Sequence, residues 1–204
     1  LTATVLFTDL ADFTTIIEKM PPEAIISWLN EYMEEMSHIV MQHNGMVNKY
    51  IGDAIMAIFG VPEKHELFEE IAHDALNAVE CALAFNERLR ELNRHWEGKN
   101  YPVVKMRAGI CTGALVAGSF GSSKRMEYTV IGDTVNIASR LESFDKTICC
   151  PTTQNPCRTF ISQSTYQFIK SKVSHIDIAR VGEFQLKGKA EYVEVYRIQA
   201  RSPI

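Results

Sequence analysis

The chain has 204 residues, of which 46% are hydrophobic and 23% charged, and its 21 Lys+Arg against 25 Asp+Glu give a net charge of −4. This composition is that of an ordinary folded domain, so it excludes a disordered chain, a collagen-like repeat and a coiled coil. No apolar run approaches the roughly 18 residues that cross a bilayer, and the acidic balance disfavours non-specific nucleic-acid binding. We therefore expect no membrane contact by this segment and no nucleic acid as a partner.

The first half of the chain predicts a strand, an amphipathic helix, a hairpin and a long helix, in that order. The strand is a short β-branched apolar run, and the helices have apolar residues at three- and four-residue spacing. The hairpin consists of two apolar runs separated only by Gly52 and Asp53, a Gly-first pair that is typical of a tight turn. These elements fall at residues 4–8, 25–40 after a helix-starting Pro22, 46–51 with 54–59, and about 67–96.

The second half predicts further short strands and two more helices. Gly113, Gly118 and a Gly/Ser-rich turn at 120–124 separate strands, and Asp133 lies where it would N-cap a helix over about 134–144. The strands fall at 103–112, 115–117, 128–131, 158–161, 175–181 and 192–198, and the last helix at 163–169. Interleaved strands, helices and hairpins predict a mixed or antiparallel sheet with helices on one face, an α+β fold rather than a doubly wound one.

The five cysteines are odd in number and have no zinc-binding spacing, which favours reduced thiols. Cys149, Cys150 and Cys157 lie close together in a polar, proline-containing stretch that is typical of a loop. A disulfide or a metal clip there stays open as an alternative. Redox sensitivity of the protein is a minor hypothesis that follows from it.

Two aspartates are the first candidates for chemistry. Asp9 follows a buried strand, where a carboxylate is unfavourable unless it is paired or coordinated, and Asp53 lies at the hairpin turn. If the first strand lies beside the hairpin, the two carboxylates meet at one end of the sheet, an arrangement that suits Mg²⁺. The alternative is an ordinary turn aspartate at Asp53 and a turn or cap role for Asp9. Spacing alone does not decide between the two.

Two further clusters are candidates for nucleotide contacts. In a helix that begins near Thr134, Asn136 and Arg140 are four residues apart and share one face, where they suit a sugar and a phosphate. Lys187 and Lys189, on either side of a glycine between two strands, suit a polyphosphate. Taken singly, a solvated helix face and a charged hairpin turn are the more ordinary explanations.

Together, these segments resemble the catalytic domain of class III nucleotidyl cyclases, in particular its bacterial and soluble adenylyl branch. The matching motifs are 5–10 with Phe13 and Thr14, 48–54, 107–110 with Gly113, Arg125 with 128–140, and 186–189. They occur in the family's order over almost the whole chain, which argues against a chance match. The resemblance implies an α+β fold with a ferredoxin-like βαββαβ core, and a single catalytic domain over residues 1–204. Because the chain begins with Leu1, we expect a domain excised from a longer protein.

The resemblance also implies a metal site. Asp9 and Asp53 match the family's metal-binding aspartates, which would hold two Mg²⁺ or Mn²⁺ ions. The Leu10 carbonyl is the implied further metal ligand, and the N–H groups of Phe13 and Thr14 are the implied phosphate contacts.

The remaining implied residues contact the nucleotide. Asn136 matches the residue that orients the ribose, and Arg140 matches the arginine that stabilises charge at the α-phosphate in the transition state. Lys187 matches the lysine that binds the terminal phosphates, and Arg125 is a weaker candidate for a second phosphate contact. The ribose 3′-oxygen would attack the α-phosphorus in line, and pyrophosphate would leave.

Lys49 and Thr129 match the two positions at which the family selects the base. Lys49 would donate to adenine N1, and the Thr129 hydroxyl or a neighbouring carbonyl would accept from N6, whereas guanine needs the opposite pattern. The pair therefore implies ATP as substrate, and threonine at this position is typical of a branch often activated by bicarbonate. This pair disfavours a guanylyl cyclase. A degenerate, non-catalytic cyclase half usually lacks an aspartate or the Asn/Arg pair, and none of these is missing here. A palm-type polymerase or diguanylate cyclase would not explain Lys49 or the helix that carries Asn136 and Arg140.

In this family the site lies between two catalytic domains, one of which supplies the aspartates and the other the base, ribose and phosphate contacts. This chain carries both sets, so the resemblance implies a head-to-tail homodimer with shared sites. Lys49 and Asp53 would then serve opposite sites although they are four residues apart. The irregular stretch 144–157 departs from the family's short Gly-containing loop. We expect a cytoplasmic domain, whose parent protein could be soluble or membrane-attached.

Overall fold

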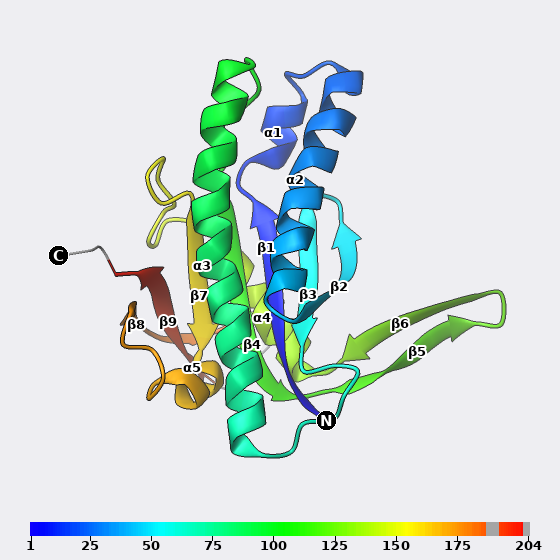
Figure 1. Ribbon diagram of the computed structural model, residues 1–204, viewed down its shortest axis with the longest axis vertical. Helices are drawn as coiled ribbons and strands as arrows, with labels where there is room; N and C mark the ends of the chain where they lie inside the picture. Colours follow the sequence, from blue (N-terminus) through cyan, green and yellow to red (C-terminus); the bar gives the residue numbers. More distant parts are fainter. Residues whose placement is uncertain (187–191, 202–204) are drawn as a thin grey trace.

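A mixed sheet forms the centre of the molecule in the computed structural model, which describes residues 1–186 and 192–201 (Figure 1). Its seven strands follow the order β2-β3-β1-β4-β7-β9-β8, and β5 pairs with β6 in a separate hairpin. The strands are β1 (Thr2–Leu10), β2 (Gly45–Ile51), β3 (Ala54–Phe59), β4 (Met106–Ala114), β5 (Val116–Ser122), β6 (Arg125–Ile131), β7 (Cys157–Ser162), β8 (Ile176–Gln185) and β9 (Tyr192–Ala200). The helices are α1 (Phe13–Ile17), α2 (Pro22–Gln42), α3 (Phe68–Gly98), α4 (Asp133–Ser143) and α5 (Gln163–Ile169).

The first four strands and the helices between them form the predicted βαββαβ core. β1 lies between β3 and β4 and is antiparallel to both, with Thr8 opposite Ile55 on one side and Ala108 on the other. β2 and β3 form the predicted hairpin, and its turn contains Gly52, whose φ of 65° is one that glycine adopts without strain. β7 then pairs parallel with β4, so the sheet is mixed and the predicted α+β class is confirmed.

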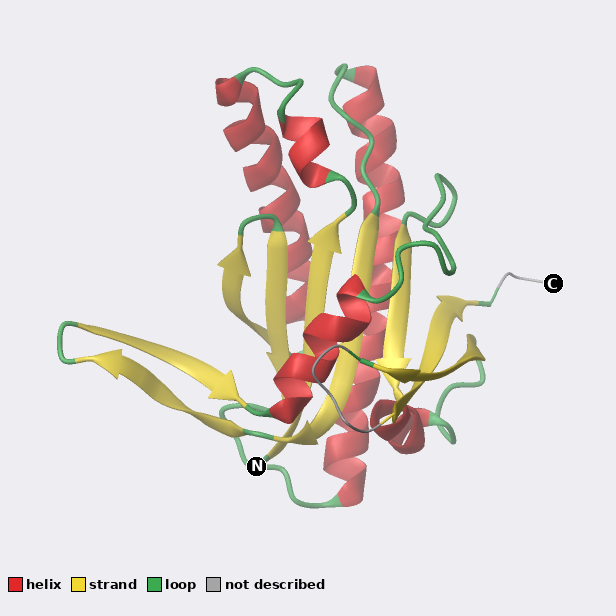
Figure 2. Ribbon diagram, turned by 180° about the vertical axis from the view of Figure 1, so that it is seen from behind, coloured by secondary structure: helices red, strands yellow, loops and turns green. Residues whose placement is uncertain are grey.

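The central strands bury side chains on both faces of the sheet. Leu6 of β1 packs with Trp28 of α2 and Phe85 of α3 in the larger core. Val5, the preceding residue, belongs to a second core that includes Ala138 of α4. Figure 2 shows α4 on the face opposite α2 and α3. The prediction that the helices share one face is therefore wrong for α4, because the continuous apolar run of β1 needs cover on both sides.

Helix α4 lies so close to β4 that only glycine fits beneath it. A Cβ atom at Gly109 would lie 2.2 Å from the backbone oxygen of Ala138 and 2.3 Å from the backbone nitrogen of Glu142. The N-cap residue of the helix is Gly132, and Asp133 is already the first helical residue. The prediction that Asp133 caps the helix is therefore wrong by one position.

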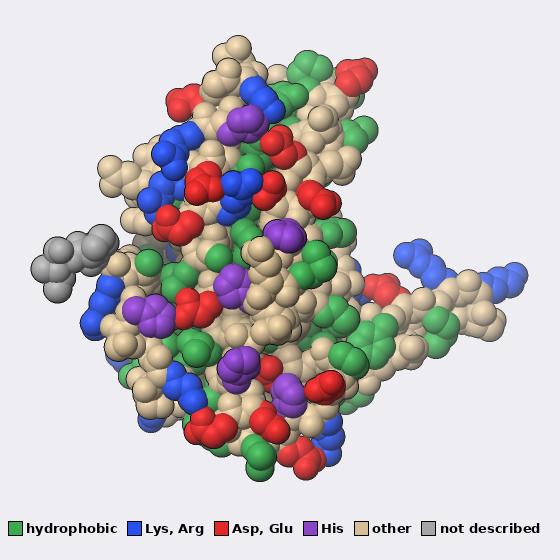
Figure 3. Space-filling view, in the orientation of Figure 1, with side chains coloured by type: hydrophobic (Ala, Val, Ile, Leu, Met, Phe, Trp, Pro, Cys, Tyr) green, Lys and Arg blue, Asp and Glu red, His purple; other side chains and the backbone are tan. Residues whose placement is uncertain are grey.

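Strands β5 and β6 form an arm that projects from the body of the molecule (Figures 1 and 3). The strands extend to Ser122 and from Arg125, so the predicted turn over 120–124 is shorter than expected. Apolar side chains along the arm are exposed, with Val116 at 71% and Phe120 at 66%. Figure 3 shows Lys and Arg side chains at its tip. A two-stranded ribbon that exposes apolar side chains in this way is typical of an interaction surface.

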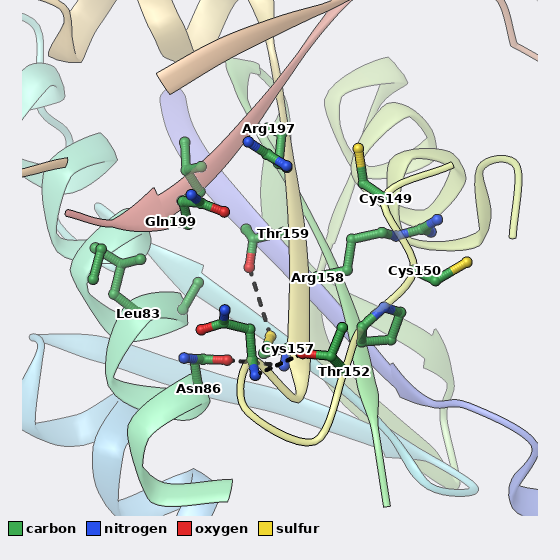
Figure 4. A pocket seen from close by; sticks show the side chains of 15 residues that line it. Leu83, Asn86, Cys149, Cys150, Thr152, Cys157, Arg158, Thr159, Arg197 and Gln199 are labelled. Atoms are coloured by element: carbon green, nitrogen blue, oxygen red, sulfur yellow. Dashed lines mark hydrogen bonds between the residues drawn. The ribbon is translucent and has the colours of Figure 1, made fainter. Parts of the chain in front are cut away.

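Arg158 of β7 organises the irregular segment that follows α4. Its guanidinium donates four hydrogen bonds of 2.8–3.0 Å to backbone carbonyls, namely those of Glu142, Phe144, Asp145 and Ile148. Figure 4 shows Arg158 beside the segment that carries Cys149 and Cys150. The segment is irregular as predicted, and the buried guanidinium satisfies carbonyls that would otherwise be paired in a helix or strand.

A cavity of about 180 Å³ lies between this segment, α3, β7 and β9 (Figure 4), and none of the predicted site residues lines it. The five cysteines all lie in the described part of the chain, where no disulfide joins them. Burial raises the pKa of Cys157 to about 12, which disfavours the thiolate that redox chemistry needs. Redox sensitivity stays a prediction without structural support at Cys157.

Candidate active site

The end of β1 and the β2–β3 turn bring Asp9 and Asp53 together. The Leu10 N–H donates to Asp53 Oδ2 at 2.9 Å, which holds the Asp53 side chain at the end of β1. Burial raises the pKa of Asp53 to about 6, and the negative charge of Asp9 adds to the increase. The two carboxylates therefore converge as the strand order predicts, and the charge of Asp9 disfavours ionisation of Asp53.

Arg107 of β4 adds a positive charge to this end of the sheet. Its Nη2 donates to Asp9 Oδ2 at 2.7 Å and its Nε donates to Glu142 Oε1 at 3.2 Å, and the residue is only 6% exposed. Burial, and then the charge of Asp9, raise the pKa of Glu142 to about 7. Sequence reasoning gave Arg107 no role, because its position opposite Asp9 exists only once β1 and β4 are paired.

Asp9 and Asp53 are suited to a divalent cation, because carboxylate oxygens are the ligands it prefers and because the two side chains bring negative charge close together. In the described ranges, no group of three or more His, Cys, Asp or Glu side chains is arranged to hold a metal ion. Two carboxylates leave the other coordination positions to a backbone carbonyl, water or phosphate oxygens, which is how Mg²⁺ is usually bound in proteins. The predicted backbone ligand, Leu10, follows Asp9 directly and is tied to Asp53 through its N–H.

The chain turns sharply after β1 and enters α1. Asp12 has a left-handed φ of 59°, and Phe13 and Thr14 are the first two residues of the helix. The first N–H groups of a helix have no acceptor inside it, so those of Phe13 and Thr14 remain for a ligand near Asp9. α1 is not predicted from the sequence, because five residues are too few to show helical periodicity.

A second polar cluster lies where β2 meets β6. Lys49 Nζ lies 2.6 Å from Glu127 Oε1, and Thr129 Oγ1 donates to Asn48 Oδ1 at 3.1 Å. Asn48 Nδ2 in turn donates to the carbonyl oxygen of Tyr128 at 2.9 Å. The two positions predicted to select the base therefore lie in one cluster. Asn48 lies in the matched motif 48–54 but received no role from the sequence, and Glu127 lies outside the matched motifs, because the contacts of both depend on β6 lying against β2.

The other predicted residues make no direct contact with the aspartates among the described residues. Asn136 is exposed and Arg140 half-buried on α4, whose Ala138 is buried against the sheet. Arg125 begins β6 at the tip of the arm, and Lys187 lies outside the described residues. Across 1–186 and 192–201, no hydrogen bond or ion pair joins Asn136, Arg140 or Arg125 to either aspartate. The link between α4 and Asp9 runs instead through Glu142 and Arg107.

Comparison with known proteins identifies the class. The family model for the adenylate and guanylate cyclase catalytic domain matches residues 2–200. The crystal structure of the adenylyl cyclase CyaB from P. aeruginosa has a TM-score of 0.85 at 32% identity and covers 99% of this chain and 95% of that one. For the guanylyl cyclase Cya2 the TM-score is 0.82 at 29% identity, with 100% and 94% covered.

This chain belongs to the family of adenylate and guanylate cyclase catalytic domains. Adenylate cyclase 1 of Rhizobium meliloti is 40% identical over 143 residues, which are 70% of this chain and 21% of that protein. The chain thus spans about a fifth of this relative's length. Both adenylyl and guanylyl cyclases are among the similar proteins, so membership by itself does not select the nucleotide. No helix within the described ranges combines the length and hydropathy that spanning a membrane requires.

Proposed function

We propose that this domain is an adenylyl cyclase, which converts ATP into 3′,5′-cyclic AMP and pyrophosphate. The observation that carries the proposal is the polar cluster that contains Lys49 and Thr129. Adenine has an acceptor at N1 and a donor at N6, which match an ammonium donor and a hydroxyl acceptor. Guanine has a donor at N1 and an acceptor at O6, so it is mismatched at both positions.

Asp9 and Asp53 would hold two Mg²⁺ or Mn²⁺ ions, with the Leu10 carbonyl as a further ligand. When bound, the ions lower the pKa of the ribose 3′-hydroxyl and neutralise charge on the triphosphate. Arg107 keeps one oxygen of Asp9 engaged in a charge-assisted hydrogen bond, which holds the carboxylate in place before the cation arrives. The N–H groups of Phe13 and Thr14 bind phosphate oxygens beside it.

The proposed reaction is an in-line displacement at the α-phosphorus. The ribose 3′-hydroxyl loses its proton to water. Its oxygen then bonds to the α-phosphorus, and the bond to the bridging oxygen breaks so that pyrophosphate leaves with the electron pair. Asn136 orients the ribose, and Arg140 stabilises the negative charge that develops on the α-phosphate. Lys187 contacts the terminal phosphates, with Arg125 as a weaker second contact.

We infer that two copies of the chain share each site. Within the described residues of one chain, Asn136 and Arg140 make no hydrogen bond or ion pair with the aspartates, which supports this, because the reaction needs both groups on one nucleotide. The exposed apolar side chains of the β5–β6 arm supply a surface suited to a partner. A head-to-tail homodimer closes with two equivalent sites.

Mixing two inactive variants tests the shared site. Asp9→Ala and Arg140→Ala should each abolish activity alone, since each removes one part of both sites. Random mixing gives about half heterodimers with one intact site each, so about a quarter of wild-type activity should return. Activity is measured after co-refolding the two variants, with each refolded alone as the control. No recovery above the single variants would contradict shared sites.

The proposed substrate is tested by incubating the purified domain with ATP or GTP and Mg²⁺ or Mn²⁺, and identifying the cyclic product by chromatography. We expect cyclic AMP, with kcat/KM for ATP at least about tenfold above that for GTP, as two mismatched hydrogen bonds imply. Preferential formation of cyclic GMP would favour the guanylyl alternative, in which Glu127 rather than Lys49 meets the base. No product from either nucleotide would favour a non-catalytic binding domain.

Bicarbonate activation stays a prediction from the resemblance alone, because no feature of the described residues marks a bicarbonate site. The rate at fixed pH with and without bicarbonate decides it, and an unchanged rate rejects it.

A further inference from the structure

Asn48 lies at an irregular position in β2. Val47 is paired with Ala57 and Lys49 with the adjacent Met56, so Asn48 is the extra residue of a bulge in the β2–β3 ladder. Bulges redirect a side chain out of the regular alternation and are frequent beside active sites. Here the redirected side chain reaches β6, where it makes both of its hydrogen bonds.

Those two hydrogen bonds determine which way the Asn48 amide faces. Nδ2 donates to the Tyr128 carbonyl oxygen at 2.9 Å, and Oδ1 accepts from the Thr129 hydroxyl at 3.1 Å. The flipped amide would place its own oxygen against the Tyr128 carbonyl, where two acceptors would face each other without a proton between them. The backbone of β6 therefore makes Asn48 an acceptor toward Thr129.

This arrangement removes an ambiguity at Thr129. A threonine hydroxyl has one proton and two acceptor lone pairs, so an unrestrained hydroxyl can either donate to a ligand or accept from it. Because Asn48 Oδ1 takes the Thr129 proton, only the lone pairs remain for a ligand. This hydroxyl can therefore accept a hydrogen bond from an amino group of the ligand, but it has no proton to donate to a carbonyl oxygen.

We propose that Asn48 is a positioning residue for base selection, which holds the Thr129 hydroxyl as an acceptor so that the pocket takes the exocyclic amino group of adenine and rejects the O6 carbonyl of guanine. The inference rests on the proposed function, since it adds Asn48 to the pocket formed by Lys49 and Thr129. Lys49 Nζ lies 2.6 Å from Glu127 Oε1. The donor, Lys49, is therefore held by Glu127, and the acceptor, Thr129, is held by Asn48.

The test compares kcat/KM for ATP and for GTP in the whole chain with Mn²⁺, for Asn48→Ala and Asn48→Asp. Asn48→Ala frees the Thr129 proton to bond with guanine O6, so the ATP/GTP ratio should fall about fivefold to tenfold, the effect of one neutral hydrogen bond. Asn48→Asp retains an oxygen that accepts this proton and should keep most of the wild-type ratio, while its second oxygen, which faces the Tyr128 carbonyl, should lower the activity with both nucleotides. If Asn48→Ala does not fold, Asn48→Leu, which is closer in volume, takes its place.

A second background shows whether Asn48 acts through Thr129. In Thr129→Val the hydroxyl is gone, so adding Asn48→Ala should leave the ATP/GTP ratio where Thr129→Val alone sets it. The inference is overturned if Asn48→Ala keeps the wild-type ATP/GTP ratio, whether or not overall activity falls. It is also overturned if Asn48→Ala changes the ratio equally in the wild type and in Thr129→Val. The wild-type ATP/GTP ratio tests the proposed function separately. A wild-type chain that does not prefer ATP would contradict both the proposed function and the role of Asn48. A preference for ATP that does not change in Asn48→Ala would contradict only the role of Asn48.

Discussion

Replacing Asp53 by asparagine should abolish cyclase activity and leave the metal-free fold at least as stable as the wild type. Loss of one cation-holding carboxylate should lower kcat/KM by about 10³-fold or more, since metal ions supply several kcal/mol of charge stabilisation in such sites. The fold should not suffer, because asparagine still offers an oxygen to the Leu10 N–H and removes the repulsion from Asp9.

The stability difference should depend on pH with a definite sign. Folding raises the pKa of Asp53 from 3.8 to about 6, so its ionisation destabilises the metal-free fold above about pH 6. That unfavourable contribution fades as the pH falls from 6 towards 4, and it is absent below the unfolded pKa of 3.8, where the carboxyl is protonated in both states. Urea unfolding of wild type and Asp53→Asn across this range should therefore give curves that converge at low pH. A wild type that is more stable than the variant at pH 8 without metal would contradict this.

Adding Mg²⁺ or Mn²⁺ gives a measurement that is independent of activity. The melting temperature of the wild type should rise with the cation, because the folded state binds it, and that of Asp53→Asn should not. Asp177→Asn, an exposed change on β8, serves as the matched control and should respond as the wild type does. An equal rise in all three proteins would show that the cation binds elsewhere.

Replacing Gly109 by alanine should have the largest effect on the fold. The added Cβ would lie 2.2 Å from the Ala138 oxygen and 2.3 Å from the Glu142 nitrogen, so α4 must move away from β4. Backbone displacement of this kind costs about 3 kcal/mol of unfolding free energy. Because α4 also carries Asn136 and Arg140, kcat should fall even in the molecules that remain folded.

Gly98→Ala at the end of α3 is the control for this prediction, since a Cβ there meets no atom within 4 Å. It should change stability by less than about 1 kcal/mol and leave kcat unchanged. Both variants are measured by urea unfolding and by initial rates. A Gly109→Ala protein as stable and active as Gly98→Ala would show that α4 does not lie tightly against β4.

The first half of the fold is predictable from local patterns. The apolar run of β1, the Gly52–Asp53 turn and the helical spacing of α2 each specify their element with no knowledge of the rest. The convergence of Asp9 and Asp53 then follows from strand order, because the end of β1 and the β2–β3 turn lie at the same end of the sheet. These are the features for which short-range sequence signals and long-range packing agree.

The parts that could not be predicted depend on contacts between distant segments. Gly109 permits the close approach of α4 to β4 on the opposite face, and that approach has no signature in the spacing of α4 itself. Asn48 and Arg107 both lie in matched motifs, but their roles appear only when β6 reaches β2 and when β4 pairs with β1. The irregular segment after α4 is likewise held by hydrogen bonds from the Arg158 side chain to its backbone carbonyls, and not by regular secondary structure.

The central claim is that two aspartates hold cations for a nucleotide whose adenine is read by Lys49 and Thr129. Crystals grown with Mn²⁺ and 3′-deoxy-ATP, which cannot cyclise, test it through the anomalous signal of manganese. We expect manganese between Asp9 and Asp53 of one copy, and the adenine amino group against Thr129 of the other. Manganese bound away from both aspartates, or a base that contacts neither Lys49 nor Thr129, would contradict it.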